Sequence, residues 1–130
     1  MGKWNSTTQG RFAEALVADR LRACGWDILL RNHRRRGSEL DIVALRSRTL
    51  VIVEVKFRKK LVTTPEEAIT KRQRLCLASG VRGFLAEFDC WRGNWDTIRI
   101  DLVVVYGSSA GLPQCYKAHH VKNVFEIEDV

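Results

Sequence analysis

Two carboxylates and a lysine, Asp41, Glu54 and Lys56, follow the pattern Asp-(x)12-Glu-x-Lys. Neighbouring carboxylate oxygens are the ligands that Mg²⁺ or Mn²⁺ prefers in proteins. An ammonium group beside such an ion can orient a water or neutralise charge on a bound phosphate. The bare pattern is weakly specific, because Glu-x-Lys downstream of an aspartate occurs in many proteins by chance. Its meaning depends on whether the fold brings the three side chains together.

The elements that would position these residues are two strands, Glu39 to Leu45 and Leu50 to Arg58, around a turn at residues 46–49. A pairing in which residue numbers sum to 95 places Asp41 opposite Glu54 and Glu39 opposite Lys56. A shift of one residue would put charges among apolar side chains, so the register is well specified. Ser47-Arg48 is a poor type I′ pair, so the centre of the loop is better defined than its length.

Each face of this hairpin has its own character. One face is apolar throughout, and the other is apolar near the turn and charged further out. The first carries Leu40, Ile42, Ala44, Val51, Val53, Val55 and Phe57, and the second carries Val43, Leu45, Leu50, Ile52, Glu39, Asp41, Glu54 and Lys56. Like charges directly opposite on a sheet are destabilising, and a low dielectric makes the repulsion worse. A divalent cation between the carboxylates would remove it. The alternative is a solvated face on which Lys56 pairs with the glutamates.

A helix predicted over Thr7 to Cys24 offers a third carboxylate. Glu14, Val17, Ala18 and Leu21 are spaced i, i+3, i+4, i+7 and share one face. If this stripe packs on the apolar end of the face that carries the hairpin carboxylates, Glu14 points towards them. The alternative is a boundary glutamate that bends out to water.

The remaining elements predict an α/β domain with a mixed sheet of about five strands and helices on its faces. A strand is expected over Trp26–Arg31, followed by a basic turn at residues 32–37. Thr64, with Pro65 and Glu67, predicts a capping box and a helix to about Ser79, and a bent or broken segment past Gly80. Further strands are expected over Thr97–Tyr106, in a central position, and over Gln114–Val121, at an edge.

Charge indicates a polyanionic partner, most commonly nucleic acid. The formal net charge is +7, and residues 1–60 hold 14 basic and 6 acidic side chains. Six residues near the hairpin and on the second helix are candidates for phosphate contacts: Arg34, Arg35, Arg36, Arg58, Lys59 and Lys71. The alternative is a solvated basic surface. Asp101, with Arg99 on the same strand face, is interpreted as structural, and His119-His120 as an ordinary edge-strand pair.

Length and composition limit the class of protein. A chain of 130 residues suits a single domain over residues 1–130. Its longest apolar stretch, Leu102 to Tyr106, is far shorter than a membrane span, so we expect a soluble, cytoplasmic protein without membrane contact. The four cysteines form no C-x-x-C pair and are expected to be free thiols.

The two hairpin motifs, Gly37-Ser38-Glu39-Leu40-Asp41-Ile42-Val43-Ala44 and Val53-Glu54-Val55-Lys56-Phe57-Arg58, resemble those of the YraN-like uncharacterised protein family. That family is predicted to be endonuclease-like and is distantly similar to archaeal Holliday-junction resolvases, within the PD-(D/E)xK nuclease superfamily. The resemblance extends over most of the chain. Supporting positions are Glu14, Gly25, Asn32, Pro65, Ala68-Ile69, Lys71, Ile100 to Val103 and His120. One departure is Ser38-Glu39, where the family usually has Gly-Glu two residues before the aspartate.

The resemblance implies a three-layer, restriction-endonuclease-like fold and a Mg²⁺-dependent endonuclease acting on DNA, including branched or junction DNA. Asp41 and Glu54 would hold Mg²⁺ or Mn²⁺ with the carbonyl of Val55, Lys56 would act on the water or the phosphate, and Glu14 would serve a second metal or the outer shell. Symmetric cutting of a junction would require a homodimer. The alternatives are a non-catalytic nucleic-acid-binding module on the same fold and a scaffold protein that keeps the fold only.

Overall fold

In a computed structural model of the protein, residues 6–35, 37–59, 64, 69–107 and 116–126 are described. Across these residues, five strands form one sheet in the order β1-β2-β3-β4-β5. They are β1 (Asp27–Arg35), β2 (Ser38–Arg46), β3 (Thr49–Arg58), β4 (Thr97–Gly107) and β5 (Tyr116–Val121). β3 and β4 are parallel and the other neighbours are antiparallel, so the predicted mixed sheet is confirmed.

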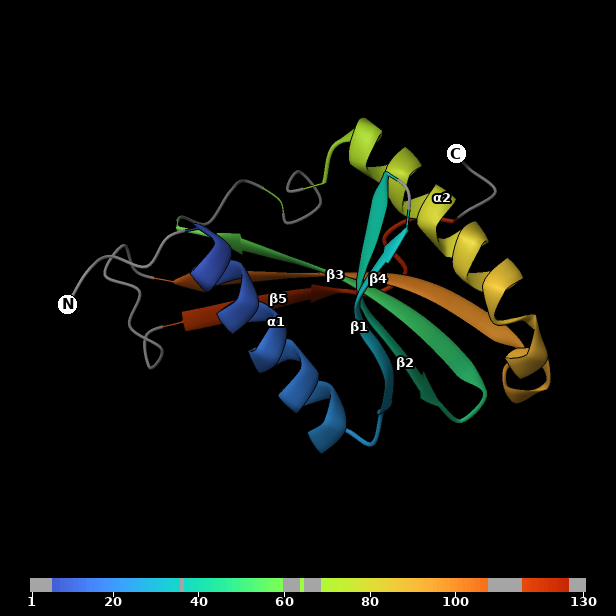
Figure 1. The fold of residues 1–130 in the computed structure, drawn as a ribbon. Helices are drawn as coiled ribbons and strands as arrows, with labels where there is room; N and C mark the ends of the chain where they lie inside the picture. Colours follow the sequence, from blue (N-terminus) through green and yellow to red (C-terminus); the bar gives the residue numbers. More distant parts are fainter. Residues whose placement is uncertain (1–5, 36, 60–63, 65–68, 108–115, 127–130) are drawn as a thin grey trace.

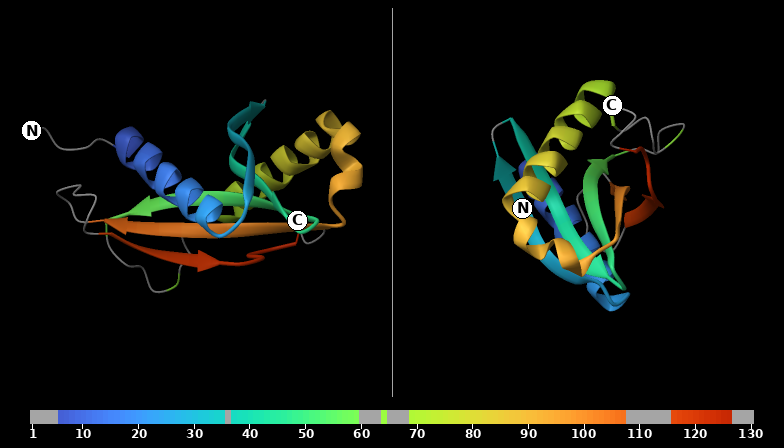
Figure 2. Two further views of the ribbon diagram at one scale, coloured as in Figure 1. Left: turned by 90° about the horizontal axis from the view of Figure 1, so that it is seen from below. Right: turned by 90° about the vertical axis from the view of Figure 1, so that its right-hand side faces the viewer.

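The two α-helices cover opposite faces of this sheet. Figure 1 shows α1 (Ser6–Ala23) and α2 (Lys71–Glu87) on opposite sides of β3, β4 and β5. In the view from below in Figure 2, α1 lies in front of the strands and α2 lies behind them. α2 and the short 3₁₀ helix η2 (Asp89–Asn94) lie on the crossover that a parallel β3–β4 pair requires. The predicted three-layer α/β architecture is therefore confirmed.

Alternation along the central strands divides the core into two clusters. Val51 and Val53 of β3 pack with Val17, Ala18 and Leu21 of α1. Leu50 and Ile52 of the same strand belong to the cluster that contains Leu77, Val81 and Phe84 of α2. Because β3 is buried on both faces, it reads as a nearly continuous apolar run until Glu54. The charged residues at its end are therefore a departure that packing alone does not explain.

The end of α1 is fixed by the glycine that follows it. Gly25 has a φ of +88°, a value that glycine adopts without strain. Its N–H donates to Arg22 O at 3.0 Å, and Trp26 N–H donates to Leu21 O at 3.0 Å, the two bonds of a Schellman motif. This turn sends Trp26 into the α1 side of the core. The predicted helix and its C-terminal glycine are confirmed.

The β2–β3 hairpin has the predicted register near its turn. The paired residues run from Arg46 with Thr49 to Ile42 with Val53. Ser47 and Arg48 both have positive φ, 47° and 66°, so a two-residue loop closes the hairpin despite unfavourable residues. Tertiary contacts explain the choice, because Arg48 Nε lies 2.9 Å from Asp96 Oδ2 and Asp96 N–H donates to Arg48 O at 2.9 Å.

One face assignment in this hairpin is wrong. The pattern predicts Leu40 beside Ile42, but Leu40 packs in the α2 cluster, whereas Ile42 packs in the α1 cluster. Leu40 and Val43 thus share a side, so the strict alternation of β2 breaks between them.

The predicted basic turn at residues 32–37 is also wrong for most of its length. β1 continues to Arg35, which pairs with Ser38 of β2. Asn32 lies inside the strand with a φ of +52°, and the turn itself is confined to the neighbourhood of Gly37, with a φ of +70°. Backbone pairing with β2 therefore outweighs the local turn signal of the polar residues. Arg36 lies outside the described residues.

The start of α2 differs from the prediction as well. Thr70, not Thr64, caps the helix: Gln73 N–H donates to Thr70 Oγ1 at 3.1 Å, and Thr70 N–H donates to Gln73 Oε1 at 2.8 Å. Ile69, just before the cap, is 4% exposed, so its burial fixes where the chain enters the helix. Thr64 is not helical, and Pro65 and Glu67 lie outside the described residues.

No break follows Gly80, since α2 continues without interruption to Glu87. Gly80 is buried, and a Cβ there would meet Ser38 Oγ at 2.9 Å and Leu40 Cδ2 at 3.2 Å. The glycine therefore permits close packing of α2 on β2 and does not end the helix.

We predict opposite responses of two helical glycines to side chains. A Cβ at Gly10 of α1 would have no neighbour within 4 Å, so Gly10→Ala should raise the free energy of unfolding by about 1 kcal/mol. Gly80→Leu should lower it by about 2 kcal/mol through overpacking against Ser38 and Leu40. Urea denaturation of both variants measures this. Equal effects at the two positions would contradict the close contact between α2 and β2.

Candidate active site

The predicted carboxylate pair lies where β2 and β3 part. Their ladder ends at Ile42 with Val53, so the predicted ladder pairs of Asp41 with Glu54 and of Glu39 with Lys56 are not formed. Instead, Val55 N–H donates to Asp41 Oδ2 at 2.8 Å. A side-chain carboxylate thus replaces the backbone acceptor that the neighbouring strand would supply.

The side chains of Asp41 and Glu54 nevertheless meet through a hydrogen bond between their carboxyl groups. Both are largely withdrawn from water, with Asp41 at 8% exposed and the Glu54 side chain at 14%. Lys56 Nζ lies 3.0 Å from Glu54 Oε1, and the lysine side chain is 17% exposed. The structure therefore brings together the two carboxylates and the lysine of the Asp-(x)12-Glu-x-Lys pattern.

Burial and mutual repulsion hold this pair partly protonated. The pKa of Glu54 is raised from 4.5 to about 7, mainly by burial and also by the negative charge of Asp41, against the effect of Lys56. Burial also raises the pKa of Asp41, although Val55 N–H and Lys56 act in the other direction. A hydrogen bond between two carboxyl groups needs one proton, so the pair favours a shared proton as the pH falls below about 7.

Glu14 reaches the same region from α1. The pKa of its carboxyl is raised from 4.5 to about 7, mainly by burial and also by the charges of Asp41 and Glu39, against the effect of Arg31. The predicted packing route is wrong, because the stripe of Val17, Ala18 and Leu21 covers the face of Ile42 and Val53. Glu14 nevertheless lies close enough to Asp41 for the charge of the aspartate to act on its carboxyl.

Sequence reasoning gave no site role to Asn32. With its amide oriented to satisfy its neighbours, Asn32 Nδ2 donates to Glu14 Oε2 at 2.7 Å and to Glu39 Oε1 at 3.3 Å. This residue also has the left-handed φ of 52° inside β1, a conformation that asparagine tolerates. By its local pattern, an asparagine among arginines predicts a turn. The sequence features that could have indicated a site role for Asn32 are its polar side chain and its match to the YraN-like family at this position.

Glu14 does not complete a compact three-residue ion site. Among the described residues, no three carboxylate, imidazole or thiolate side chains converge closely enough to hold one ion. A single ion at Asp41 and Glu54 therefore needs a further ligand from the backbone, water or substrate.

Asp101 provides a useful contrast, because it is also fully buried. Burial acts to raise its pKa, but hydrogen bonds from His120, Arg99 and the Asn123 N–H outweigh this effect and lower it. Arg99 Nε lies 2.9 Å from Asp101 Oδ1, and His120 Nε2 lies 2.7 Å from Oδ2. This carboxylate is fully partnered, which supports its structural interpretation. His120 is therefore more than an ordinary edge-strand residue.

The predicted phosphate-contacting residues differ in position. Arg34 has an 81% exposed side chain and lies 3.6 Å from Glu39. Arg58 Nη1 donates to Phe57 O at 2.8 Å, and Lys59 and Lys71 are exposed. The side chain of Arg35 and all of Arg36 lie outside what the structure describes. Arg34 and Arg58 flank the parting strands, whereas Lys71 begins α2.

Two tryptophans of this chain, Trp26 and Trp95, are part of the core. Trp26 is 6% exposed in the α1 cluster, and Trp95 is 8% exposed in the α2 cluster. Both tryptophan rings are therefore inaccessible to the bases of a nucleic acid.

Two cysteines described by the structure, Cys24 and Cys76, are free and exposed.

Comparison with known proteins assigns the family. The model of the uncharacterised protein family UPF0102 matches residues 13–105, a segment that includes Glu14, Asp41, Glu54 and Lys56. A UPF0102 protein of Nocardia farcinica is 40% identical over 119 residues, covering 89% of this chain and 87% of the relative. One of Chlorobaculum tepidum is 32% identical over 123 residues, covering 92% and 93%. One of Desulforapulum autotrophicum is 35% identical over 121 residues, also covering 92% and 93%.

The fold is a three-layer α/β domain of nuclease-like architecture, with a buried carboxylate pair at a parting hairpin. The chain belongs to the uncharacterised protein family UPF0102, which is the YraN-like family that its hairpin motifs resemble. No helix among the residues described is long and apolar enough to cross a membrane.

The raised pKa values predict that, in the presence of a chelator, the free energy of unfolding decreases as the pH rises. The folded protein binds protons at Glu14, Asp41 and Glu54 more tightly than the unfolded chain. This contribution is complete below about pH 4.5 and is lost as the pH rises through about 7. Asp41→Asn keeps an acceptor for Val55 N–H and removes one charge. It should therefore raise the free energy of unfolding by about 1 kcal/mol at pH 8, and by less at pH 5.

Asp96→Asn is the matched control for this measurement. Asp96 is exposed and paired with Arg48, which lowers its pKa through a side-chain hydrogen bond. This substitution should not raise stability at either pH. Denaturant titrations of both variants in EDTA compare them, and a gain for Asp41→Asn that is equal at pH 5 and pH 8 would contradict the shared proton.

Proposed function

We propose that this protein is a Mg²⁺- or Mn²⁺-dependent endonuclease that hydrolyses phosphodiester bonds of DNA. The observation that carries the proposal is the buried contact between Asp41 and Glu54 with Lys56 beside it. Two like charges at this position destabilise the fold, whereas the partnered Asp101 shows how this chain satisfies a buried carboxylate that serves structure. The pair is therefore better explained by a ligand than by packing.

The donor set fits a hard divalent cation. Asp41 and Glu54 supply carboxylate oxygens, and Asp41 is oriented by Val55 N–H at 2.8 Å. In a strand, the N–H and C=O of one residue point to the same edge, so the Val55 carbonyl also points into the gap beside β2. It would be the third protein ligand. Glu14, held by Asn32, would contact a second ion or a bound water.

Each side chain then has a part in hydrolysis. A bound divalent ion lowers the pKa of a water and stabilises charge on the phosphate. Asp41 and Glu54 would hold the cation beside the substrate phosphate. Lys56, whose ammonium lies 3.0 Å from Glu54, would neutralise charge on a phosphate oxygen or orient the attacking water. Glu14, with a pKa raised to about 7 by burial, is poised to exchange a proton.

The surroundings suit a polyanionic substrate. Arg34 is exposed near the end of β1, which pairs with β2, and Lys59 is exposed directly after β3. Residues 1–60, which supply the whole cluster, carry most of the positive excess of the chain. Long-range attraction towards this half would bring phosphates to the buried pair.

The test is a cleavage screen with junction, flap, single-stranded and duplex DNA in Mg²⁺, Mn²⁺ and EDTA. Cleavage should require metal.

We predict that Lys56→Ala abolishes cleavage while Mn²⁺ binding persists, because Lys56 acts on substrate and not as a ligand. Calorimetric titration with Mn²⁺ and single-turnover cleavage separate the two properties. Lys59→Ala is the matched control: Lys59 is exposed beyond the strand, so its loss should raise KM and leave kcat unchanged. Cleavage by Lys56→Ala at the wild-type rate would overturn the assignment. Binding of DNA without cleavage of any substrate would favour a non-catalytic binding module.

The basic end of β1 should contribute to DNA affinity. We predict that replacing Arg34, Arg35 and Arg36 together by alanine makes the dependence of binding on salt less steep. The negative slope of the logarithm of the binding constant against the logarithm of the salt concentration should shrink in magnitude by about 0.9 for each duplex phosphate that the protein no longer neutralises. Fluorescence anisotropy over a series of salt concentrations measures the slope. Arg72→Ala on α2, an exposed arginine away from the hairpin, provides the comparison. An unchanged slope in the triple variant would exclude these arginines from the interface.

A further inference from the structure

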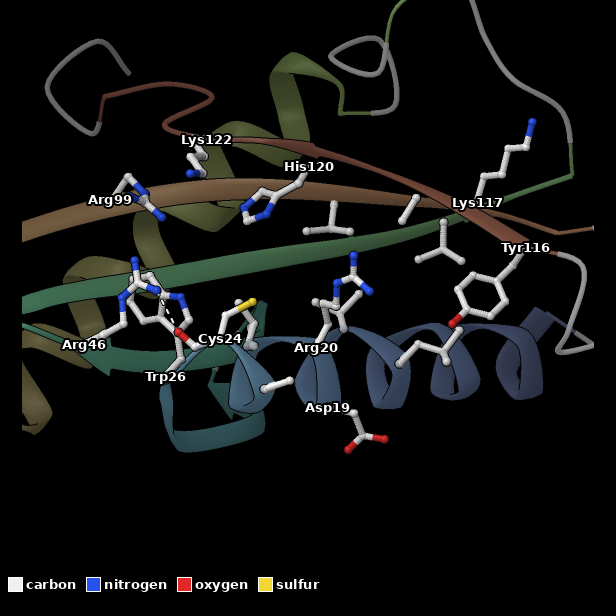
Figure 3. Close-up of a pocket in the computed structure, with 17 residues that line it drawn as sticks. Asp19, Arg20, Cys24, Trp26, Arg46, Arg99, Tyr116, Lys117, His120 and Lys122 are labelled. Atoms are coloured by element: carbon white, nitrogen blue, oxygen red, sulfur yellow. Dashed lines mark hydrogen bonds between the residues drawn. The ribbon is translucent and has the colours of Figure 1, made fainter.

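A groove separate from the carboxylate cluster lies between α1 and β5. It has a volume of about 670 Å³, and its floor is formed by Val103 and Val105 of β4. One wall comes from the α1 side chains Leu16 and Arg20, and the other from β5. Figure 3 shows these elements on either side of the opening. Glu14, Asp41, Glu54 and Lys56 are not among the residues that line this groove, so it is distinct from the carboxylate cluster.

Cationic groups point into this groove over an apolar floor. Figure 3 shows the side chains of Arg20, Arg46, Arg99 and Lys122 directed into the opening between α1 and β5. The carboxylate of Asp19, the acid among the lining residues, points away from the opening and lies 3.2 Å from Arg22. The groove is therefore electropositive, with no acidic side chain turned into it among the residues described.

The cations fall into two groups with different freedom. Arg46 and Arg99 are held in place: Arg46 Nη1 donates to Cys24 O at 2.8 Å, and Arg99 is paired with Asp101 at 2.9 Å. Arg20 and Lys122 make no ion pair within the described ranges. The fixed guanidinium groups and the side chains of Arg20 and Lys122, which lack ion-pair partners among the described residues, together form a positively charged surface that can bind an anion.

An aromatic side chain stands at one end. Tyr116 is 43% exposed, which is high for a large apolar residue, and its ring meets Phe12 edge-on with centroids 6.2 Å apart. A flat, exposed ring beside an electropositive groove offers a stacking surface for a base. Apolar floor, cations and aromatic edge together match a ligand with both phosphates and flat rings.

We propose that this groove binds a single-stranded segment of nucleic acid. The groove is about as large as a site for a small molecule, so it admits a few nucleotides of one strand but not two paired strands. α1 contributes Glu14 to the carboxylate cluster and Arg20 to the groove, so a single unpaired strand that follows this helix would reach both. The inference rests on the proposed function and deepens it, since it assigns the nuclease a substrate with an unpaired strand.

The test measures binding in EDTA, so cleavage plays no part. A fluorescein-labelled twelve-nucleotide oligothymidylate is titrated with protein, followed by anisotropy at several salt concentrations. Arg20→Glu and Lys122→Glu should each weaken binding about tenfold at low salt and reduce the salt slope by about 0.7 for each phosphate no longer neutralised. Arg72→Glu is the matched control: it makes the same change of charge on α2, on the opposite face of the sheet, and Arg72 is exposed and is not among the residues that line the groove. Its slope should stay at the wild-type value.

Tyr116 tests the stacking surface independently of charge. Tyr116→Ala should weaken binding of the oligothymidylate about tenfold with an unchanged salt slope, and Tyr116→Phe should restore it. If Arg20→Glu, Lys122→Glu and the Arg72→Glu control have the same effect on binding, the groove is overturned as the site. If thymidine monophosphate binds as tightly as the strand, the groove is a nucleotide site and the single-strand assignment is wrong. If binding depends on the groove but no substrate is cleaved, the nuclease proposal alone is overturned. If DNA with a single-stranded tail is cleaved and neither Arg20→Glu nor Lys122→Glu changes its cleavage, the groove proposal alone is overturned.

Discussion

The repulsion between Asp41 and Glu54 is the constraint on which the site depends. Two carboxyl groups come into contact where water is scarce, so neither can ionise at its ordinary pKa beside the other. The contact exists because β2 and β3 stop pairing beyond Ile42 and Val53, and Asp41 accepts the N–H that the ladder leaves free. The parting of the hairpin thus creates the gap, orients one carboxylate and leaves the β3 edge beyond Val53 without backbone pairing to β2.

The helices on the two faces of the sheet contribute to the gap between β2 and β3 in different ways. α1 covers one face and brings Glu14 to the cluster through the same helix that forms one wall of the basic groove. α2 covers the other face and packs closely on β2 through Gly80, which lies against Ser38 and Leu40. Leu40 packs in the α2 cluster and Ile42 in the α1 cluster, and Asp41 lies between these two residues of β2.

The buried carboxylates show two ways in which this fold treats charge. Asp101 receives hydrogen bonds from Arg99, His120 and Asn123, and these tie β4 to β5 and to the segment after it. Its negative charge is fully compensated, and it also holds Arg99 and His120 at the wall of the groove. Asp41 and Glu54 have only Lys56 and one N–H between them. The difference in compensation separates a carboxylate that serves the fold from a pair suited to a ligand.

The order of residues along the chain is enough to predict the members of the carboxylate cluster and most of the frame around them. Apolar alternation predicts the hairpin register from Ile42 to Leu45, and local signals at Gly25 predict the end of α1, because both depend on neighbours along the chain. Features that depend on distant contacts emerge only in the folded molecule. Packing ends the ladder before Asp41, turns Leu40 to α2, caps α2 at Thr70 beside the buried Ile69, and places Asn32 between Glu14 and Glu39. Local patterns describe two faces of a strand, but only packing against both helices decides which face a residue takes when the alternation breaks.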